Sequence, residues 1–330
     1  MPTAKAIRIR EPGGPEVLEL GEVEIPKPGA SQVLVDVAAA GLNRADCLQR
    51  RGFYPAPPGV PPDVPGLELA GVVEAVGSSV TAWKPGDRVM GIVGGGAMAT
   101  RVVTEAAELM PVPESMSLDE AAAVPEVFLT AYDAIVLQGG LQAGQSVLFH
   151  AVASGIGTAG IQLASVLGAS SIGTSRTADK LPRCAELGLT HAVLVEDGQF
   201  ADAVTAFAPK GVNVILDTVG AAYMPQNVKV IAKQGRIIVI GLMGGVKGEL
   251  NLGALLAKRA SIHGSVLRSR SPAEKAALTE SFADAMLDKL ATKELAPVID
   301  ATLPMSEIQD AHRRMDANET FGKLVLSWGS

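Results

Sequence analysis

The chain has 330 residues, of which 28 are Lys or Arg and 35 are Asp or Glu, so its formal net charge is −7. No stretch gathers the basic side chains that would neutralise phosphates, which argues against a nucleic-acid-binding protein. The two cysteines, Cys47 and Cys184, offer neither a disulfide framework nor a zinc lobe, and we expect a reducing, cytoplasmic setting. No run approaches the roughly eighteen apolar residues of a membrane span. The length suits two domains.

The sequence pattern of the first part of the chain predicts a β-rich domain. Residues 1–110 contain short alternating segments separated by Gly- and Pro-containing turns, which predicts a partly barrel-like fold. Ser117 and Glu120 form a capping box that opens a short helix, which we expect Pro125 to end, and a second helix follows over Val127–Leu137. The predicted strands are residues 1–10, Leu18–Ile25, Gln32–Ala38, Leu69–Val76, Arg88–Val93 and Thr100–Val103.

A glycine loop between a strand and a helix is the most informative motif. The apolar run Ser146–Phe149 leads into Gly155, Gly157 and Gly160, spaced as G-x-G-x-x-G, and a helical pattern follows. Such glycines permit a tight turn, close approach of the backbone to a pyrophosphate, and close packing of helix on strand. Ser154, just before the loop, can bond a phosphate or cap the helix. The context predicts a dinucleotide site, with a Gly-rich turn in another α/β protein as the alternative.

From Gln145 onward strands and helices alternate, which predicts a doubly wound, six-stranded parallel sheet whose ligand crevice lies at the carboxyl ends of the strands. With 48% hydrophobic residues but only 4% aromatics, aliphatic packing must dominate. Two helices, Pro272–Lys289 and Met305–Met315, and a strand, Lys323–Ser327, close the chain, and we expect that strand to rejoin the first domain. The sheet's predicted strands are Ser146–Phe149, Ser171–Thr174, Ala192–Val195, Val212–Leu216, Arg236–Ile240 and Ser261–His263.

The end of the second strand of this sheet predicts a preference for NADPH. Folds that select NAD place an acidic residue about twenty residues after the first loop glycine, where it binds the ribose hydroxyls. In this chain the count reaches Ser175, followed by Arg176, with Lys180 one helical turn further on. A hydroxyl and two cations suit a 2′-phosphate, although a solvated helix start is the competing interpretation.

A set of motifs, taken in order, resembles the zinc-independent quinone oxidoreductase branch of the medium-chain dehydrogenase/reductase superfamily, nearest to the tumour-suppressor-inducible quinone oxidoreductases and more distantly to zeta-crystallin. The resemblance implies a GroES-like, β-rich catalytic domain of residues 1–126 and 268–330 and a Rossmann domain of residues 127–267. The motifs are residues 41–46 (GLNRAD), 49–54 (QRRGFY), 65–68 (PGLE), 85–89 (PGDRV), 241–245 (GLMGG) and 267–270 (LRSR).

Two departures from the zinc-dependent relatives bear on the chemistry. Asn43 stands where those relatives carry a cysteine ligand, and Leu67 where they carry a histidine. Neither side chain suits zinc, so we expect no metal site. Quinones accept hydride without a metal, and the oxyanion that forms needs only hydrogen-bond donors and a proton source. The resemblance places Asn43 and Tyr54 beside the nicotinamide as the catalytic pair; the alternatives are an asparagine that satisfies loop backbone groups and a tyrosine that packs as a lid.

The resulting hypothesis is an NADPH-dependent quinone reductase, free of metal and flavin, that transfers hydride to a small-molecule quinone in a cleft between two domains. The alternatives are an enoyl or alkenal reductase, or a non-catalytic NADPH-binding structural or regulatory protein. By family analogy we also expect a homodimer. The cofactor-binding residues implied by the glycine loop, the second strand and the resemblance are Thr130, Ser154, Gly155, Ile156, Gly157, Ser175, Arg176, Lys180, Asp217, Gly241, Leu242, Met243, Leu267, Arg268 and Lys323.

Overall fold

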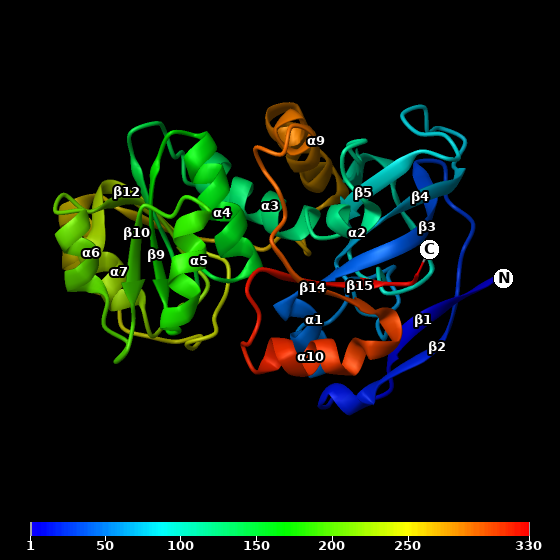
Figure 1. The fold of residues 1–330 in the computed structure, drawn as a ribbon, viewed down its shortest axis with the longest axis horizontal. Helices are drawn as coiled ribbons and strands as arrows, with labels where there is room; N and C mark the ends of the chain where they lie inside the picture. The colour runs from blue at the N-terminus through cyan, green and yellow to red at the C-terminus, as the bar shows by residue number, and fades with distance from the viewer. Residues whose placement is uncertain (1, 330) are drawn as a thin grey trace. The chain divides into compact units, whose positions relative to one another are not determined.

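The computed structural model describes residues 2–329 and divides the chain into two compact units. Unit 1 comprises Met1–Leu129 and Leu267–Ser330, so its sequence is interrupted by unit 2, Thr130–Val266. Figure 1 follows the chain from the N-terminal strands of unit 1, through unit 2, and back to unit 1. None of the helices in the described part of the chain combines the length and the apolar character that crossing a membrane requires.

Unit 1 is built on a mainly antiparallel sheet around one long strand, β3 (Gln32–Leu42). This strand pairs with β4, β6 and β15, and β15 comes from the end of the chain. The sheet order is β14-β15-β3-β4-β5-β7, with β6 beside β3, while β1 and β2 form a separate pair. The other strands of the unit are β1 (Thr3–Ile9), β2 (Leu18–Glu24), β4 (Glu68–Val76), β5 (Arg88–Ile92), β6 (Arg101–Glu105), β7 (Leu109–Pro111), β14 (Ile299–Pro304) and β15 (Lys323–Ser327).

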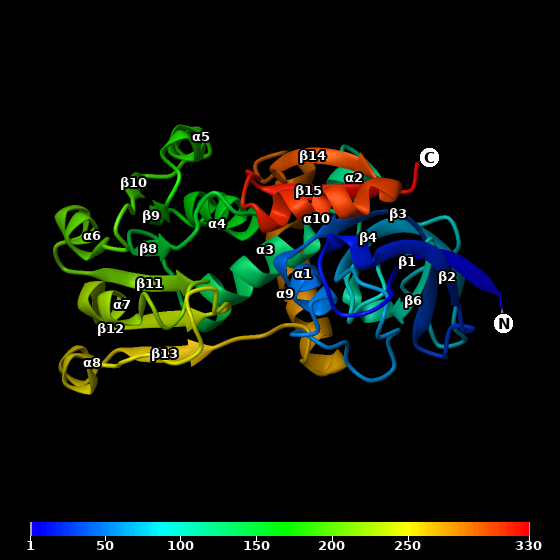
Figure 2. The same cartoon turned by 90° about the horizontal axis from the view of Figure 1, so that it is seen from below.

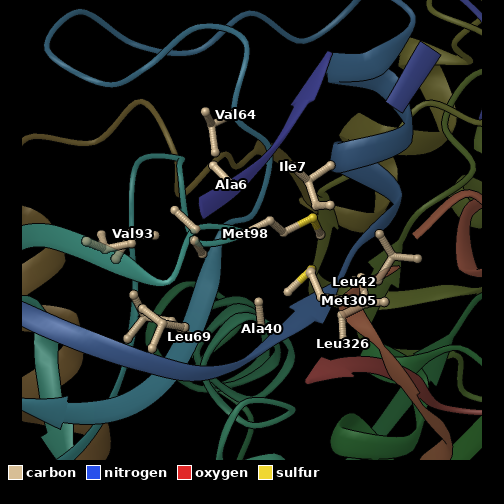
Figure 3. Packing of buried hydrophobic residues seen from close by; sticks show 14 of the residues in the cluster. Ala6, Ile7, Ala40, Leu42, Val64, Leu69, Val93, Met98, Met305 and Leu326 are labelled. Atoms are coloured by element: carbon tan, nitrogen blue, oxygen red, sulfur yellow. The ribbon is translucent and has the colours of Figure 1, made fainter. Parts of the chain in front are cut away.

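The core of unit 1 is aliphatic, as the low aromatic content predicts. Side chains from β1, β3, β4 and β15 meet in it, among them Ile7, Leu42, Leu69 and Leu326, all of them fully buried (Figure 3). Because β15 contributes to this core and pairs with β3 from Leu42 to Ala39, the final strand joins the β-rich unit. The expectation that the chain returns to its first domain therefore agrees with the observed pairing.

The helices of unit 1 differ from the prediction at Pro125. The helix opened by the capping box of Ser117 and Glu120 already ends at Ala121, and Pro125 begins the next helix. The prediction that Pro125 ends a helix was wrong because proline, which lacks an N–H and has a fixed φ, is equally well suited to the first turn. The helices are α1 (Arg44–Arg50), α2 (Leu118–Ala121), α3 (Pro125–Tyr132), which runs into unit 2, α9 (Pro272–Ala291) and α10 (Ile308–Asp316).

Unit 2 is a six-stranded parallel sheet with the order β10-β9-β8-β11-β12-β13. Numbered along the unit, this is the 3-2-1-4-5-6 order of a dinucleotide-binding fold, and Figure 2 shows the strands one after another in that sequence. The predicted α/β class, a β-rich unit plus a doubly wound sheet, is confirmed. The strands are β8 (Ser146–Phe149), β9 (Ser170–Ser175), β10 (His191–Leu194), β11 (Val212–Asp217), β12 (Ile231–Val239) and β13 (Ser261–Gly264).

Helices connect most of these strands, and α3 is continued by a π-helical segment, η3 (Asp133–Gln138), where the sequence predicted one regular helix. From β8 the sheet grows to one side through β9 and to the other through β11, so the strand order reverses between β8 and β11. The carboxyl ends of these two paired strands lie side by side. This is the position at which doubly wound sheets bind their ligands. The helices of the unit are α4 (Gly155–Val166), α5 (Leu181–Glu186), α6 (Ala201–Phe207), α7 (Met224–Val230) and α8 (Leu252–Lys258).

Candidate functional site

The glycine loop of unit 2 connects β8 to α4. Ser154 is the N-cap of α4, and its Oγ accepts a hydrogen bond from the N–H of Gly157 at 3.2 Å. A side chain on Gly157 would overlap the carbonyl oxygen of Val152, and one on Gly160 would overlap the ring of Phe149. The loop and helix thus pack too closely for any residue but glycine. The first N–H groups of a helix have no acceptor within the helix and favour an anion, so these residues fit a dinucleotide pyrophosphate.

A buried chain of polar side chains lies behind the strand ends. Asn227 Nδ2 donates to Asp217 Oδ2 at 3.0 Å, so the other amide atom of Asn227, its Oδ1, must accept from His150 Nε2 at 2.7 Å. The Nδ1 atom of His150 is then unprotonated and accepts from the hydroxyl of Thr174 at 2.9 Å. Burial lowers the pKa of His150, against the opposing pull of Asp217, which agrees with this neutral form. Sequence analysis assigned no role to His150 and missed this chain of side chains, whose members lie on β9, β11, α7 and the turn after β8.

Asp217 shapes the turn that follows β11. Its Oδ1 accepts from the N–H groups of Val219 and Gly220 at 2.7 and 2.9 Å, and both carboxylate oxygens therefore have protein partners. The loop after β12 lies against this turn, since the N–H of Met243 donates to Thr218 O at 3.3 Å. Gly241 belongs to the same loop, with no room for a side chain beside Thr218, and its neighbours Leu242 and Met243 expose about half of their surface. The structure thus brings Asp217 and residues 241–243 together.

The end of β9 carries the residues that we expect to read the 2′-phosphate. Ser175 is buried, and its hydroxyl both donates to and accepts from the backbone of Thr177, at 3.0 Å each. Arg176 is exposed, and its charge acts on the phenol of Tyr223, whose pKa burial raises. Lys180 follows at the end of a 3-10 turn. Thr130, where α3 enters unit 2, keeps a buried hydroxyl for which the described residues provide no hydrogen-bond partner.

In unit 1 Asn43 belongs to a saturated network. Its Nδ2 donates to Gly41 O at 3.3 Å and to Glu68 Oε1 at 2.9 Å, while its Oδ1 accepts from Lys323 Nζ at 2.7 Å. Lys323 Nζ makes two further bonds, to Leu42 O at 2.9 Å and to Glu68 Oε1 at 2.6 Å. Every donor of both side chains is therefore engaged within the protein. The geometry favours a positioning role for Asn43. The amine of Lys323 is likewise bound to residues of unit 1.

Three carboxylates surround this network, and sequence analysis assigned none of them. Glu68 is fully buried between Lys323 and the N–H of Glu126, which donates to its Oε2 at 2.8 Å. Asp46 accepts from the N–H groups of Asn43 and Gly66, at 2.8 Å each, yet its burial raises its pKa to about 6. The Oε2 atom of Glu126 is buried without a hydrogen-bond partner among the described residues. Glu68 and Asp46 lie inside the quoted motifs, whereas no pattern in the sequence singles out Glu126.

Tyr54 lies against Arg268. The guanidinium carbon of Arg268 is 4.9 Å from the centre of the Tyr54 ring, and its Nη1 donates to Tyr54 O at 3.0 Å. The other two nitrogens of Arg268 donate to Gly94 O at 2.7 Å and Gln49 Oε1 at 2.8 Å. Burial raises the pKa of Tyr54, as does the charge of Glu126. Arg268 thus holds the loop that carries Tyr54, and Leu267 beside it is buried.

Cys47 has a histidine neighbour that its sequence context did not reveal. His312 Nδ1, from α10, lies 3.5 Å from Cys47 Sγ and 3.0 Å from Arg50 Nη1. Burial raises the pKa of the thiol to about 12 and lowers that of His312 to about 3. Both groups are neutral near pH 7, so the pair lacks the thiolate that nucleophilic catalysis requires. Within residues 2–329, no three His, Cys, Asp or Glu side chains are grouped so that they could hold a metal ion.

Comparison with known proteins agrees with this architecture. Residues 29–114 match the alcohol dehydrogenase GroES-like domain, and residues 155–284 match the zinc-binding dehydrogenase family. The human quinone oxidoreductase is 30% identical over 327 residues, which cover 98% of this chain and 97% of the relative. The crystal structure of the quinone oxidoreductase of Pseudomonas syringae pv. Tomato DC3000 superposes with a TM-score of 0.88 at 33% identity, covering 98% of this chain and 99% of the other.

A mycobacterial protein solved in complex with NADPH has the same TM-score, 0.88, at 29% identity, and covers 98% of this chain and 99% of its own. The relatives thus match both units over nearly the full length of the chain. They include quinone oxidoreductases and a protein that binds NADPH. The glycine loop, the strand order and the β-rich unit all fit that description. The chain belongs to the medium-chain dehydrogenase/reductase superfamily, as an oxidoreductase that uses a nicotinamide cofactor.

Proposed function

We propose that the protein is an NADPH-dependent quinone reductase that works without a metal or a flavin. The observation that carries this proposal is the identity and environment of the residues at the two positions where zinc-dependent relatives carry ligands. Asn43 is bound into a network with Glu68 and Lys323, and Leu67 is a buried aliphatic side chain. Neither residue is a zinc ligand, and a quinone needs no metal, because hydrogen-bond donors and a proton source suffice for its reduction. Quinone oxidoreductases among the relatives support the same acceptor class.

Unit 2 has the residues to hold the cofactor. The first turn of α4 would receive the pyrophosphate, and the turn of Asp217 with residues 241–243 would border the nicotinamide half. Arg176 and Lys180 would bind the 2′-phosphate, which is the basis for proposing NADPH rather than NADH. When bound, the cofactor supplies hydride. The unpartnered hydroxyl of Thr130 is a further polar group available to it.

Unit 1 would orient the acceptor and supply the proton. Asn43 and Lys323 have no donor to spare, so their part is to fix the loop and the charge of Glu68. The phenol of Tyr54, held in place by Arg268, is the donor that can approach an acceptor carbonyl. Tyr54 thus takes the binding role, and Asn43 a positioning role.

Steady-state oxidation of NADPH tests the proposal. The purified protein, with ortho- and para-quinones as acceptors, should consume NADPH well above the rate without acceptor. Acceleration by enones but by no quinone would instead identify an enoyl or alkenal reductase. Binding of NADPH with no acceleration by either class would indicate a non-catalytic role.

We also propose a homodimer formed through unit 2. β13 is an edge strand, and an exposed edge presents unpaired N–H and C=O groups to another chain. Next to it in sequence, Leu252 and Leu256 of α8 are 66% and 78% exposed, and Val246 is 75% exposed. Apolar surface of this kind marks association sites. Light scattering should give twice the chain mass, and Leu256→Asp should shift it toward the monomer; a wild-type monomer at micromolar concentration would contradict the proposal.

A further inference from the structure

Glu126, in unit 1, has a carboxyl oxygen that the hydrogen-bond network around Asn43 does not use. It is the second residue of α3, and its backbone N–H donates to Glu68 Oε2 at 2.8 Å. Glu68 in turn binds Lys323 at 2.6 Å and the amide of Asn43 at 2.9 Å. Glu126 is therefore anchored through its backbone, while its side-chain Oε2 is buried and unpartnered within the described structure.

The charges around Glu126 decide where a proton resides. Two neighbouring carboxylates cannot both ionise cheaply, and the one with better partners keeps the charge. Glu68 has an ammonium, an amide and a backbone N–H as partners, whereas the Oε2 of Glu126 is buried with no partner among the described residues. Burial raises the pKa of Glu126 to about 8, and Glu68 and Asp46 add to this effect while Lys323 and Arg268 oppose it. A carboxylic acid that is protonated at neutral pH is a proton donor close to its ideal working range.

Tyr54 connects this acid to the expected acceptor position. The charge of Glu126 acts on the phenol of Tyr54, and the same Arg268 that lowers the pKa of Glu126 lies over the Tyr54 ring. Glu126 as a residue is partly exposed, although its Oε2 is buried, so solvent can return a proton to it. The acid is thus within electrostatic reach of Tyr54 and able to recover its proton from solvent.

We propose that Glu126 is the proton donor that completes the reduction of the acceptor, an inference that rests on the quinone reductase function proposed above. Addition of hydride brings two electrons to the quinone and leaves one oxygen as a phenolate. The O–H bond of Glu126 breaks, a new O–H bond forms on that oxygen, and the hydroquinone is complete. The Glu126 carboxylate then takes a proton from water. One quinone, one hydride and one proton are consumed for each hydroquinone.

The test compares the wild type with Glu126→Gln and with Glu114→Gln, an exposed carboxylate that serves as the matched control. For the wild type, kcat/KM with a quinone should be level below pH 8 and fall tenfold per pH unit above it. Glu126→Gln keeps the size of the protonated group but cannot give up a proton, so kcat/KM should drop about 100-fold, the usual scale of general acid catalysis. Its remaining activity should lack the ionisation near pH 8, and Glu114→Gln should behave as wild type.

Two further measurements separate a chemical role from a structural one. Titration of NADPH fluorescence should give the same dissociation constant for Glu126→Gln and wild type. In the cofactor-free wild type, the infrared band of a protonated carboxyl should disappear with a midpoint near pH 8 and be missing from Glu126→Gln. A wild type that reduces no quinone refutes the proposed function itself. If the wild type reduces quinones and Glu126→Gln keeps both that activity and the ionisation near pH 8, only the role of Glu126 is refuted.

Discussion

Because Glu126 binds a proton more tightly in the folded protein than in the unfolded chain, it should make folding depend on pH. Its pKa rises from an ordinary value of 4.5 to about 8. Between these values the folded state holds a proton that the unfolded state has lost, so the free energy of unfolding falls as pH rises. Glu126→Gln removes this dependence because the amide does not ionise. The wild type should therefore lose stability relative to the variant throughout this window.

The size of the effect follows from the shift. Each pKa unit is worth about 1.4 kcal/mol, so the wild type should lose about 3 kcal/mol relative to Glu126→Gln between pH 5 and pH 7, and about 5 kcal/mol over the full shift. Any pH-independent effect of the substitution, such as burying an amide N–H₂, cancels in this difference. With a typical urea dependence, 3 kcal/mol moves the unfolding midpoint by about 1 M or more.

Tryptophan fluorescence is a suited assay, since the two tryptophans, Trp83 and Trp328, both belong to unit 1, as Glu126 does. Urea unfolding followed by this signal at pH 5, 6, 7 and 8 gives the two midpoint curves. The curves should diverge steadily and become parallel only above pH 8. If wild type and variant stay parallel between pH 5 and pH 7, Glu126 is ionised in the folded protein and the reasoning about the network is wrong.

Three other predictions concern the cofactor and the metal. Replacing Arg176 and Lys180 together by alanine should raise the KM for NADPH at least tenfold with little change for NADH; equal losses would show that they do not bind the 2′-phosphate. Prolonged chelator treatment should leave quinone reduction intact, and elemental analysis that found one zinc per chain would contradict metal independence. His150→Ala leaves the hydroxyl of Thr174 and the Oδ1 of Asn227 without the partner that His150 provides, at about 1–3 kcal/mol for each unsatisfied group, and should weaken NADPH binding in a fluorescence titration. Unchanged affinity would show that the buried chain does not shape the loops.

The sequence was most informative where function depends on local structure. The glycine loop, the strand before it and the helix after it lie within about 20 residues, and their pattern reflects packing that any chain with those contacts must satisfy. Pro125 shows the limit of local rules, since proline suits the end of one helix and the start of the next equally well. The final strand was also expected to return to the β-rich unit, and it pairs there with β3.

The roles of the candidate site residues could not be predicted in the same way, because they depend on which donors and acceptors already have partners within the protein. Nothing in the sequence indicates that the Oδ1 of Asn43 accepts a hydrogen bond from Lys323, 280 residues away. The tautomer of His150 likewise depends on Thr174, Asn227 and Asp217, which lie on three other elements. Saturation of donors and acceptors is a property of the tertiary structure, and no periodicity records it.

These long-range contacts also tie the proposed chemistry to the fold. Lys323 begins β15, and its amine reaches Glu68 only because β15 pairs with β3 and thereby lies beside Leu42. With Lys323 in place, the carboxylate of Glu68 has an ammonium partner at 2.6 Å, and the charge of Glu68 adds to the burial that raises the pKa of Glu126. The amine acts on Glu126 in the opposite direction, because its positive charge lowers the pKa of that carboxyl. The return of the last strand to unit 1 therefore places a cation beside Glu68 and contributes to the balance of charges that sets the pKa of Glu126.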